Sequence, residues 1–514
     1  MYICEKINSL TIKQKIAQLF IMGFSGSNIV NNDNIMKAVR SGLGGVIFFT
    51  ENIESYKGLR GLVKQLQKEA AIPLFTGIDQ EGGLVERTIA AKEKTDYLTP
   101  MALANTHNTE FIKQHTQIMS SELKYAGINM DFAPVLDVHT NKLNPVIGIR
   151  SFSSDPVEVI KYSKPVYKTF QQNNIISVGK HFPGHGESSV DSHIDMPSID
   201  IDMDKLEKIH ISPFKAAIHE GIDAVMIAHV HYKAFNKNST IPASLSKEVI
   251  TDYLINKLSF KGLIISDDMV MGGITKHYGH LEACKMAIKA GIDLFIFRDS
   301  SDKNLELIDK LAEETDKDQD LKNRIEESVY KIFKYKEKYG LFDRNIESLK
   351  IDFKQNQAQI DKIAAVSVKV VQKGKLVPIK PESKILVIAP DKSKIFNYSK
   401  DSGSLRQFLQ ISDCNEIFYS LNPEKEEIQN IIQNLENGVT VIFLSYNALI
   451  NRGQIDLLNS VKCPVIAVAA GIPEDIEIFK CSDTVIQTFC YKPPSLKALA
   501  RLLLEVSDYT KLCN

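Results

Sequence analysis

The sequence predicts an α/β protein in which a (β/α)8 barrel is followed by a smaller α/β sandwich domain. Short apolar runs alternate with amphipathic helical stretches from residue 17 to about residue 297, which is typical of βα units around a parallel sheet. There are eight such runs, and eight parallel strands in roughly 280 residues match the size of such a barrel. A doubly wound parallel sheet is the competing prediction, because it gives the same alternation.

The eight runs predict the strands of the barrel. They lie at residues 17–22, 45–49, 74–78, 129–132, 175–179, 224–228, 263–266 and 293–297. Polar residues stand at or just after the ends of six of them, namely Asp79, Asp131, Lys180 with His181, His229, Asp267 and Arg298. Because the active site of such a barrel lies where its strands end, these side chains are expected to converge on one rim.

The length of the chain predicts more than one domain. A chain of 514 residues exceeds one ordinary domain, so we expect a barrel at 1–345, a linker at 346–381 and an α/β sandwich domain at 382–514. Five further apolar runs, at 385–389, 416–420, 441–445, 465–469 and 485–488, predict the strands of the second domain. Its loops lack a dense cluster of acids and bases, which favours a structural or partner-binding role.

Charge and cysteine content narrow the class of protein. The chain has 62 Lys and Arg against 63 Asp and Glu, so its near-neutral charge gives no general attraction to nucleic acid. Its seven cysteines form no CxxC pair, which fits free thiols in a reducing compartment. No segment approaches the roughly twenty apolar residues of a membrane span, and we see no secretory signal. We expect a soluble cytoplasmic protein with no nucleic-acid or membrane partner, whose oligomeric state the sequence leaves open.

The densest group of reactive side chains follows the fifth run. The sequences KHFPGHG at 180–186 and DSH at 191–193 bring three histidines, a lysine and an aspartate into fourteen residues. Zinc sites usually present His at helical spacing or Cys pairs, and neither pattern occurs here, so no metal is predicted. An Asp two residues before a His suits proton transfer, because the carboxylate can fix the imidazole tautomer and support its charged form. A purely structural role for these histidines is the alternative.

Five motifs, taken in order, resemble family 3 of the glycoside hydrolases, and specifically its β-N-acetylglucosaminidase branch. They are GIDQEGG at 77–83, DFAPVLD at 131–137, GIRSF at 148–152, the KHFPGHG and DSH sequences, and ISDDM at 265–269. Five ordered motifs are far more specific than any lone glycine pattern. The C-terminal module is similar to the α/β sandwich of two-domain members.

The resemblance implies a retaining mechanism with a covalent glycosyl-enzyme. Asp267 is then the nucleophile, because a carboxylate can attack the anomeric carbon as the aglycone leaves. His193 is implied to be the general acid and base, with Asp191 as its orienter, in place of the usual second carboxylic acid. The pKa of an imidazole starts near roughly 6.5, whereas a carboxyl group must be buried to donate a proton at neutral pH. Asp268 is expected to cap the following helix.

The same resemblance assigns the binding of the sugar to five residues, which are Asp79, Arg87, Arg150, Lys180 and His181. Asp79 can accept paired hydrogen bonds from hydroxyls, and Arg150, Lys180 and His181 can donate to hydroxyls and to an acetamido oxygen. Each of them could instead belong to an ion-pair network at the rim of the barrel. His185 and Glu187 are expected to shape the loop, and Leu84 stands where this branch often has Arg.

The implied function is that of a cytoplasmic exo-β-N-acetylglucosaminidase without a cofactor. Its implied substrate is a small carbohydrate, a GlcNAc-containing muropeptide fragment such as GlcNAc-anhydroMurNAc released during wall recycling. One alternative is a GlcNAc phosphorylase, because no acid/base carboxylate would repel an attacking phosphate. A second alternative is a catalytically silent sugar sensor, although the intact set of Asp267, Asp191 and His193 argues against it. A β-glucosidase is less expected, since glucoside-acting members look like SDW at the nucleophile.

Overall fold

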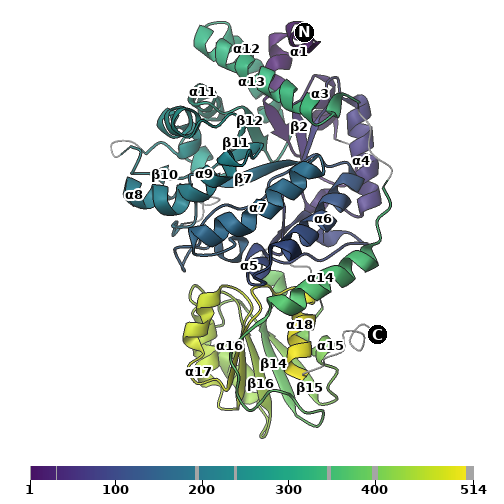
Figure 1. Ribbon diagram of the computed structural model, residues 1–514, viewed down its shortest axis with the longest axis vertical. Coiled ribbons are helices and arrows are strands. Elements are labelled where there is room, and N and C mark those ends of the chain that lie inside the picture. The colour runs from purple at the N-terminus through teal and green to yellow at the C-terminus, as the bar shows by residue number, and fades with distance from the viewer. Residues whose placement is uncertain are drawn as a thin grey trace.

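The computed structural model describes residues 2–30, 32–190, 196–236, 240–343, 349–395 and 403–504. Two domains are stacked along the long axis of the molecule, with the larger, N-terminal domain drawn above the C-terminal one (Figure 1). The larger domain contains a closed barrel, and the smaller one contains a six-stranded sheet. None of the helices described is long and apolar enough to cross a lipid bilayer.

Eight parallel strands close the barrel in the order β1-β12-β11-β9-β7-β6-β3-β2. They are β1 (Phe20–Met22), β2 (Gly45–Phe48), β3 (Phe75–Ile78), β6 (Met130–Asp131), β7 (Ile176–Phe182), β9 (Ala224–Ile227), β11 (Leu263–Asp268) and β12 (Leu294–Phe297). Each predicted run overlaps one of these strands, so the barrel is confirmed and the doubly wound sheet is wrong. Strands β7 and β11 continue beyond their apolar runs, and therefore carry Lys180, His181 and Asp267 within the barrel wall.

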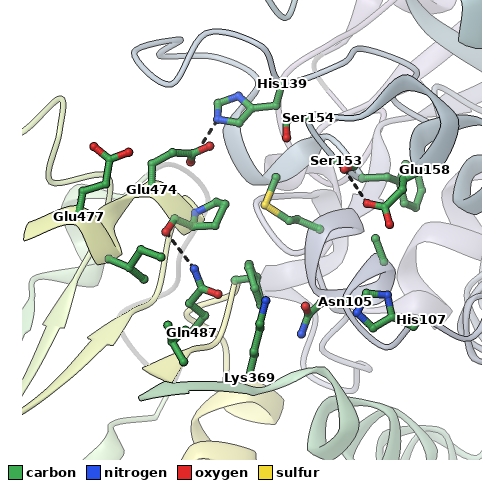
Figure 2. Close-up of a pocket in the computed structure, with 17 residues that line it drawn as sticks. Asn105, His107, His139, Ser153, Ser154, Glu158, Lys369, Glu474, Glu477 and Gln487 are labelled. Carbon is green, nitrogen blue, oxygen red and sulfur yellow. Dashed lines mark hydrogen bonds and ion pairs between the residues drawn. The ribbon is translucent and has the colours of Figure 1, made fainter. Parts of the chain in front are cut away.

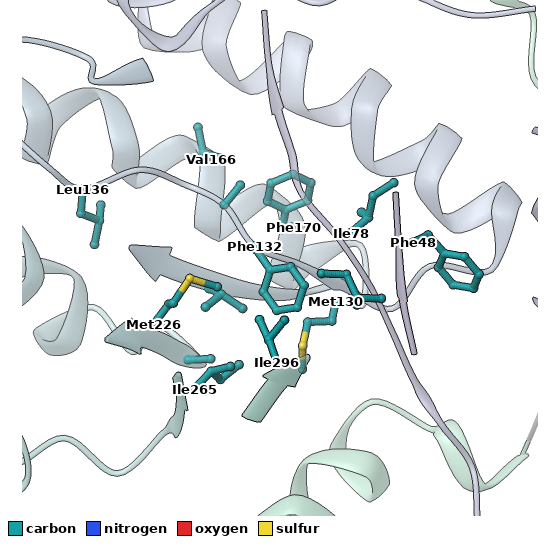
Figure 3. Packing of buried hydrophobic residues seen from close by; sticks show 14 of the residues in the cluster. Phe48, Ile78, Met130, Phe132, Leu136, Val166, Phe170, Met226, Ile265 and Ile296 are labelled. Atoms are coloured by element: carbon teal, nitrogen blue, oxygen red, sulfur yellow. The ribbon is translucent and has the colours of Figure 1, made fainter. Parts of the chain in front are cut away.

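Side chains fill the interior of the barrel. Phe132 lies among Met130, Ile265 and Ile296 in the packed core (Figure 3). Gly77 of β3 leaves the space for this ring, because a Cβ atom there would lie 2.9 Å from the Phe132 side chain. The barrel is thus closed below its polar rim by close packing, as expected for a core of native density.

Helices cover the outside of the barrel. The main ones are α2 (Ile12–Ala17), α3 (Asp33–Arg40), α4 (Tyr56–Glu69), α6 (Thr109–Ala126), α7 (Pro156–Gln172), α9 (Ser212–His219), α11 (His280–Ala290), α12 (Asp302–Thr315) and α13 (Gln319–Lys338). The first predicted run begins at residue 17, before strand β1, because Ala17 is the last residue of helix α2. Helix α6 is typical of the set, since Asn108 caps its first turn, Gly127 ends it at φ 86° and one face is buried.

Shorter elements connect these strands and helices. They are α1 (Tyr2–Asn8), β4 (Gln80–Gly82), β5 (Val85–Glu86), α5 (Pro100–Ala104), β8 (Ser198–Ile199), α8 (Met203–Lys205), β10 (His231–Tyr232) and α10 (Gly272–Thr275), with two π-helical segments at Leu206–Ile211 and Glu248–Lys257. Strands β4 and β5 form a small antiparallel hairpin directly after β3, at the rim of the barrel.

The second domain is built on a sheet with the strand order β13-β18-β17-β16-β14-β15. These are β13 (Lys369–Gln372), β14 (Ile385–Pro390), β15 (Cys414–Tyr419), β16 (Thr440–Ser445), β17 (Val465–Ala469) and β18 (Thr484–Gln487). Four helices, α15 (Leu405–Leu409), α16 (Lys425–Gln433), α17 (Gly453–Ser460) and α18 (Pro493–Leu504), lie against its faces (Figure 1). Five of the strands match predicted runs. The sixth, β13, escapes prediction because all four of its residues are exposed and it pairs antiparallel with β18.

The segment predicted to be a linker contains regular structure. Its described part, 349–381, holds α14 (Phe353–Ser367) and β13. Helix α14 packs against α5 and α6 of the barrel domain and against α18 of the second domain. Asn356 of this helix donates to the buried Glu122 of α6 at 2.7 Å. The two domains are therefore joined by a helix that contacts both, and the boundaries at 345 and 382 stay a prediction.

Candidate active site

A pocket of about 480 Å³ lies at the carboxyl ends of the barrel strands. Asp267 lines it, together with all five residues predicted to bind the sugar. These five are Asp79, Arg87, Arg150, Lys180 and His181. The apolar part of the lining includes Phe49, Leu84, Met226, Met271 and Ile296. Residues that are far apart along the chain thus meet in one cavity of the size usual for small-molecule sites.

Two carboxylates and three cations form a network on one wall of the pocket. Lys180 Nζ lies 2.9 Å from Asp79 Oδ1 and 2.6 Å from Glu81 Oε1. Arg87 Nη2 lies 2.9 Å from Asp79 Oδ2. Arg150 binds Glu81 in a bidentate manner, with Nε and Nη2 at 2.9 Å and 2.8 Å from the two oxygens. Each charge therefore has an opposite partner before any ligand enters.

The network determines which of its groups are ionised. Burial alone would raise the pKa of Glu81, but Arg150 and Lys180 lower it to about 2. Burial likewise opposes ionisation of Asp79, but Lys180 and Arg87 hold its pKa far below the usual range. Both carboxylates are thus charged at neutral pH and can accept hydrogen bonds from hydroxyl groups. The three cations can donate hydrogen bonds to hydroxyl groups.

Asp137 anchors the segment that carries the two pocket histidines. Its Oδ2 lies 2.7 Å from His181 Nδ1, and its Oδ1 accepts the backbone N–H of His185 at 2.6 Å. Burial would raise the pKa of Asp137, but the neighbouring His181 lowers it. An ionised Asp137 accepts a hydrogen bond from the protonated Nδ1 of His181. Nε2 is therefore the ring nitrogen left for a ligand.

His185 lines the same pocket and is buried. Burial, reinforced by the nearby His181, lowers its pKa to about 4, so the ring is neutral at pH 7. Its role of shaping the loop stays a prediction; its carbonyl oxygen accepts a hydrogen bond from Asn144 at 2.9 Å. Gly186 beside it approaches Val138 so closely that a Cβ atom would lie 1.7 Å from the Val138 carbonyl oxygen.

The two adjacent aspartates at the end of β11 have different surroundings. Both line the pocket, and Asp267 Oδ1 accepts the backbone N–H of Asp268 at 2.8 Å. Asp268 is buried: Oδ1 accepts the N–H of Val270 at 3.2 Å and Oδ2 lies 3.0 Å from Arg298 Nε. Burial raises the pKa of Asp268 to about 6. The expected cap is wrong, because α10 begins after Met271 and the Asp268 side chain closes the preceding turn instead.

Two predicted catalytic residues cannot be placed. Asp191 and His193 fall in the segment 191–195, which lies outside the described residues. Their roles as orienter and as general acid and base therefore stay predictions. Over the described ranges, there is no group of three or more His, Cys, Asp and Glu side chains that could hold a metal ion.

Glu81 and Asp137 are the functional residues that the sequence analysis missed. Both stand inside quoted motifs, GIDQEGG and DFAPVLD. The available signal for Glu81 was a charged residue between a strand end and two glycines, which is unusual unless the charge is paired. Asp137 offered a weaker signal, because its partners are 44 and 48 residues further along the chain.

A second cavity, of about 450 Å³, lies between the two domains (Figure 2). Its barrel side includes His107, His139 and Glu158, and its other side includes Lys369, Glu474 and Gln487. His139 and Glu474 face each other across the domain boundary, with Nε2 and Oε2 3.6 Å apart. None of the residues lining this cavity lines the barrel pocket. Asp267 and the five residues predicted to bind the sugar thus line the barrel pocket and not this cavity.

Comparison with known proteins agrees with this geometry. Residues 11–335 match the family described as "Glycosyl hydrolase family 3 N terminal domain". Beta-hexosaminidase A of Pseudoalteromonas piscicida is 29% identical over 400 residues, which cover 71% of this chain and 67% of that protein. A beta-hexosaminidase of Photobacterium profundum is 35% identical over 277 residues, which cover 53% of this chain and 79% of the relative. The solved structure of a glycoside hydrolase family 3 beta-N-acetylglucosaminidase from Paenibacillus sp. str. FPU-7 has a TM-score of 0.89 at 28% identity and covers 97% of both chains.

The charge network makes a pH-dependent contribution to stability that Glu81→Gln should reveal. The pKa of Glu81 falls from its usual 4.5 to about 2 on folding, so its stabilising effect is complete above pH 4.5 and is lost as the pH falls towards 2. At pH 7 the variant should be less stable by about 3–5 kcal/mol, because two buried cations lose a partner. Urea unfolding at pH 7, 4 and 3 should show the difference from the wild type shrinking. The control is Glu282→Gln: Glu282 is exposed, and its partner Lys285 keeps a second pair with Glu314, so stability should change by less than about 1 kcal/mol. A difference that is the same at all three pH values would contradict the assignment.

Proposed function

Because the chain belongs to glycosyl hydrolase family 3, we propose that this glycoside hydrolase is a retaining exo-β-N-acetylglucosaminidase acting on peptidoglycan-derived fragments. The observation that carries the proposal is the convergence of Asp267 and the five predicted sugar-binding residues on one pocket of the barrel. Relatives named beta-hexosaminidase and a similar structure named beta-N-acetylglucosaminidase support GlcNAc as the sugar removed.

The pocket wall suits a single N-acetylated sugar. Asp79 and Glu81 accept hydrogen bonds from ring hydroxyls, and Arg150, Lys180 and His181 donate to hydroxyls or to the acetamido oxygen. The apolar side chains of Met226, Met271 and Ile296 give a surface against which the sugar ring and the acetamido methyl group can pack. Because the donors are already fixed by Asp79, Glu81 and Asp137, they need little reorganisation when the sugar binds.

Asp267 is the nucleophile in the proposed mechanism. Its neighbour Asp268 is engaged with Arg298 and with the N–H of Val270, so its two oxygens already have partners. Asp267 attacks C1 of the sugar, a C1–oxygen bond to the enzyme forms, and the bond from C1 to the aglycone oxygen breaks.

His193 moves the protons in both steps, with Asp191 as its orienter. In the first step the imidazolium gives its proton to the departing aglycone oxygen. In the second step the neutral ring takes a proton from water, whose oxygen attacks C1 and releases the Asp267 carboxylate. Two displacements at C1 return the sugar with the β configuration it began with.

Product analysis tests the proposed function directly. The purified protein should release free GlcNAc, first as the β-anomer, from an aryl β-N-acetylglucosaminide and from GlcNAc-anhydroMurNAc in the absence of phosphate. The same reactions should be repeated with inorganic phosphate. GlcNAc-1-phosphate as the main product would replace the hydrolase by a phosphorylase, and binding of GlcNAc without turnover would favour a sensor.

The nucleophile is tested by Asp267→Ala. Turnover should fall by at least about 10⁴-fold while folding is retained, because the covalent step is removed and the binding network is not. A fluorinated GlcNAc inactivator should add its mass to the peptide that contains Asp267 in the wild type. Asp299→Ala serves as the control, since Asp299 does not line the pocket. Labelling at Asp268 would show that the two aspartates are assigned in the wrong order.

The acid and base role is tested by His193→Ala. Substrates with poor leaving groups should lose about 10²- to 10⁴-fold in rate, since only they need a proton on the departing oxygen. An activated aryl glycoside should be limited instead by the second step, and azide should restore part of that rate by attacking the intermediate. Asp191→Ala should show a weaker form of the same pattern. Equal losses on all substrates without rescue would make His193 a structural residue of the loop.

A further inference from the structure

The β4–β5 hairpin lies between the pocket and the second domain. Asp79, Glu81 and Arg87, in and beside the hairpin, face the pocket. Glu86 directly precedes Arg87. It does not line the pocket, and its side chain is fully buried elsewhere. Glu86 is the last residue of β5 and Arg87 begins a short 3-10 helix, and the two side chains enter different surroundings.

The partner of Glu86 comes from the second domain. Lys492, the residue before α18, forms an ion pair with Glu86, and the two side chains are 1% and 0% exposed. Glu86 also accepts the backbone N–H of Tyr97 at 3.3 Å. Burial raises the pKa of Glu86, and Lys492 opposes that rise. Without the ammonium group this carboxylate would be a buried, uncompensated charge.

Glu86 is rigidly connected to the sugar-binding residues. The N–H of Arg87 donates to Gln80 Oε1 at 2.9 Å, and Gln80 Nε2 donates to Thr88 Oγ1 at 2.8 Å. Arg87 in turn holds Asp79 at 2.9 Å. A shift of Glu86 therefore moves the guanidinium group of Arg87 and, with it, the carboxylate of Asp79.

A second contact fixes the other end of the hairpin. Gly83, at φ 61°, lies so close to Thr99 that a Cβ atom would be 2.2 Å from Thr99 Cγ2. The hydroxyl of Thr99 donates to the carbonyl oxygen of Phe489 in the second domain at 2.7 Å. The second domain thus supports the hairpin at both of its ends, through two residues that are close together in its own sequence.

We propose that Lys492 is a positioning residue for sugar binding, through which the second domain sets the place of Arg87 and Asp79. The inference rests on the proposed function of the barrel pocket. Lys492 does not touch the sugar and acts only by holding Glu86. The second domain then contributes to catalysis by geometry, beyond the structural or partner-binding role that its sequence predicts.

The test is Lys492→Met, which keeps the aliphatic stem and removes the charge. With an aryl β-N-acetylglucosaminide the variant should show a KM about tenfold higher and a kcat within about twofold, because the sugar clamp shifts while Asp267 stays in place. Lys492→Arg should restore most of the affinity. Hydrogen exchange of the peptide 80–88 should be faster in Lys492→Met than in the wild type, and this measurement needs no substrate.

The matched control is Lys497→Met. Lys497 lies five residues further along, on α18, and pairs with Asp361 of α14 at 2.9 Å, away from the hairpin. It should leave KM and the exchange of 80–88 unchanged. If Lys492→Met does not fold, the double variant Glu86→Gln with Lys492→Met removes both buried charges and should fold with a raised KM.

The outcomes separate the two proposals. A folded Lys492→Met protein with wild-type KM and wild-type exchange would overturn the positioning role, as would equal effects of the Lys497→Met control. A wild-type protein that turns over no GlcNAc glycoside would instead overturn the proposed function, and the exchange of 80–88 would still decide whether Lys492 positions the hairpin.

Discussion

The active site depends on the pairing of two buried carboxylates with three cations at the rim of the barrel. Removing any of these ions from water costs several kcal/mol, so Asp79 and Glu81 are stable only where Lys180, Arg87 and Arg150 meet them. The five residues come from the end of β3, the β4–β5 hairpin, the loop that follows β6 and strand β7. Their mutual attraction holds these segments in one arrangement, and the same arrangement leaves polar groups directed into the pocket. Stability of the rim and readiness to bind a sugar are therefore consequences of one network.

The sequence allowed the barrel to be predicted because buried parallel strands appear as short continuous apolar runs, and eight of them stand between residues 17 and 297. It allowed the convergence of the pocket to be predicted in part, because polar residues at the ends of parallel strands share an edge. Four of the six predicted strand ends contribute to the pocket, whereas Asp131 and His229 do not line it and are buried in contacts with Gln80 and Ser244. The assignment of roles came from the resemblance of five ordered motifs. Strand β13 could not be found in this way, since its exposed residues carry no apolar run and its pairing is decided by contacts with β18.

Residues that position other side chains, and do not line the pocket themselves, could hardly be identified from the sequence. Asp137 is separated from the backbone N–H groups it binds by 44 and 48 residues, so its role exists only in the folded chain. Lys492 is separated from Glu86 by 406 residues and belongs to another domain. Composition and spacing describe only residues that are neighbours along the chain. A carboxylate that binds a distant imidazole or hairpin looks, in the sequence, like any exposed acidic residue until its burial is known.

The different directions of two neighbours, Glu86 at the end of the β4–β5 hairpin and Arg87 directly after it, explain how two domains can share one site. Arg87 faces the pocket and Glu86 faces the second domain, so the backbone that joins these neighbours transmits the position of one to the other. This backbone has little freedom, because Gln80 bonds both the N–H of Arg87 and the hydroxyl of Thr88. A barrel alone could supply every group that touches the sugar. Lys492 supplies the buried ion pair behind Glu86, to which Lys94 of the barrel domain adds a weaker effect, and without Lys492 burial would favour the protonated form of Glu86. The second domain is thus joined to the pocket through the electrostatics of one buried pair.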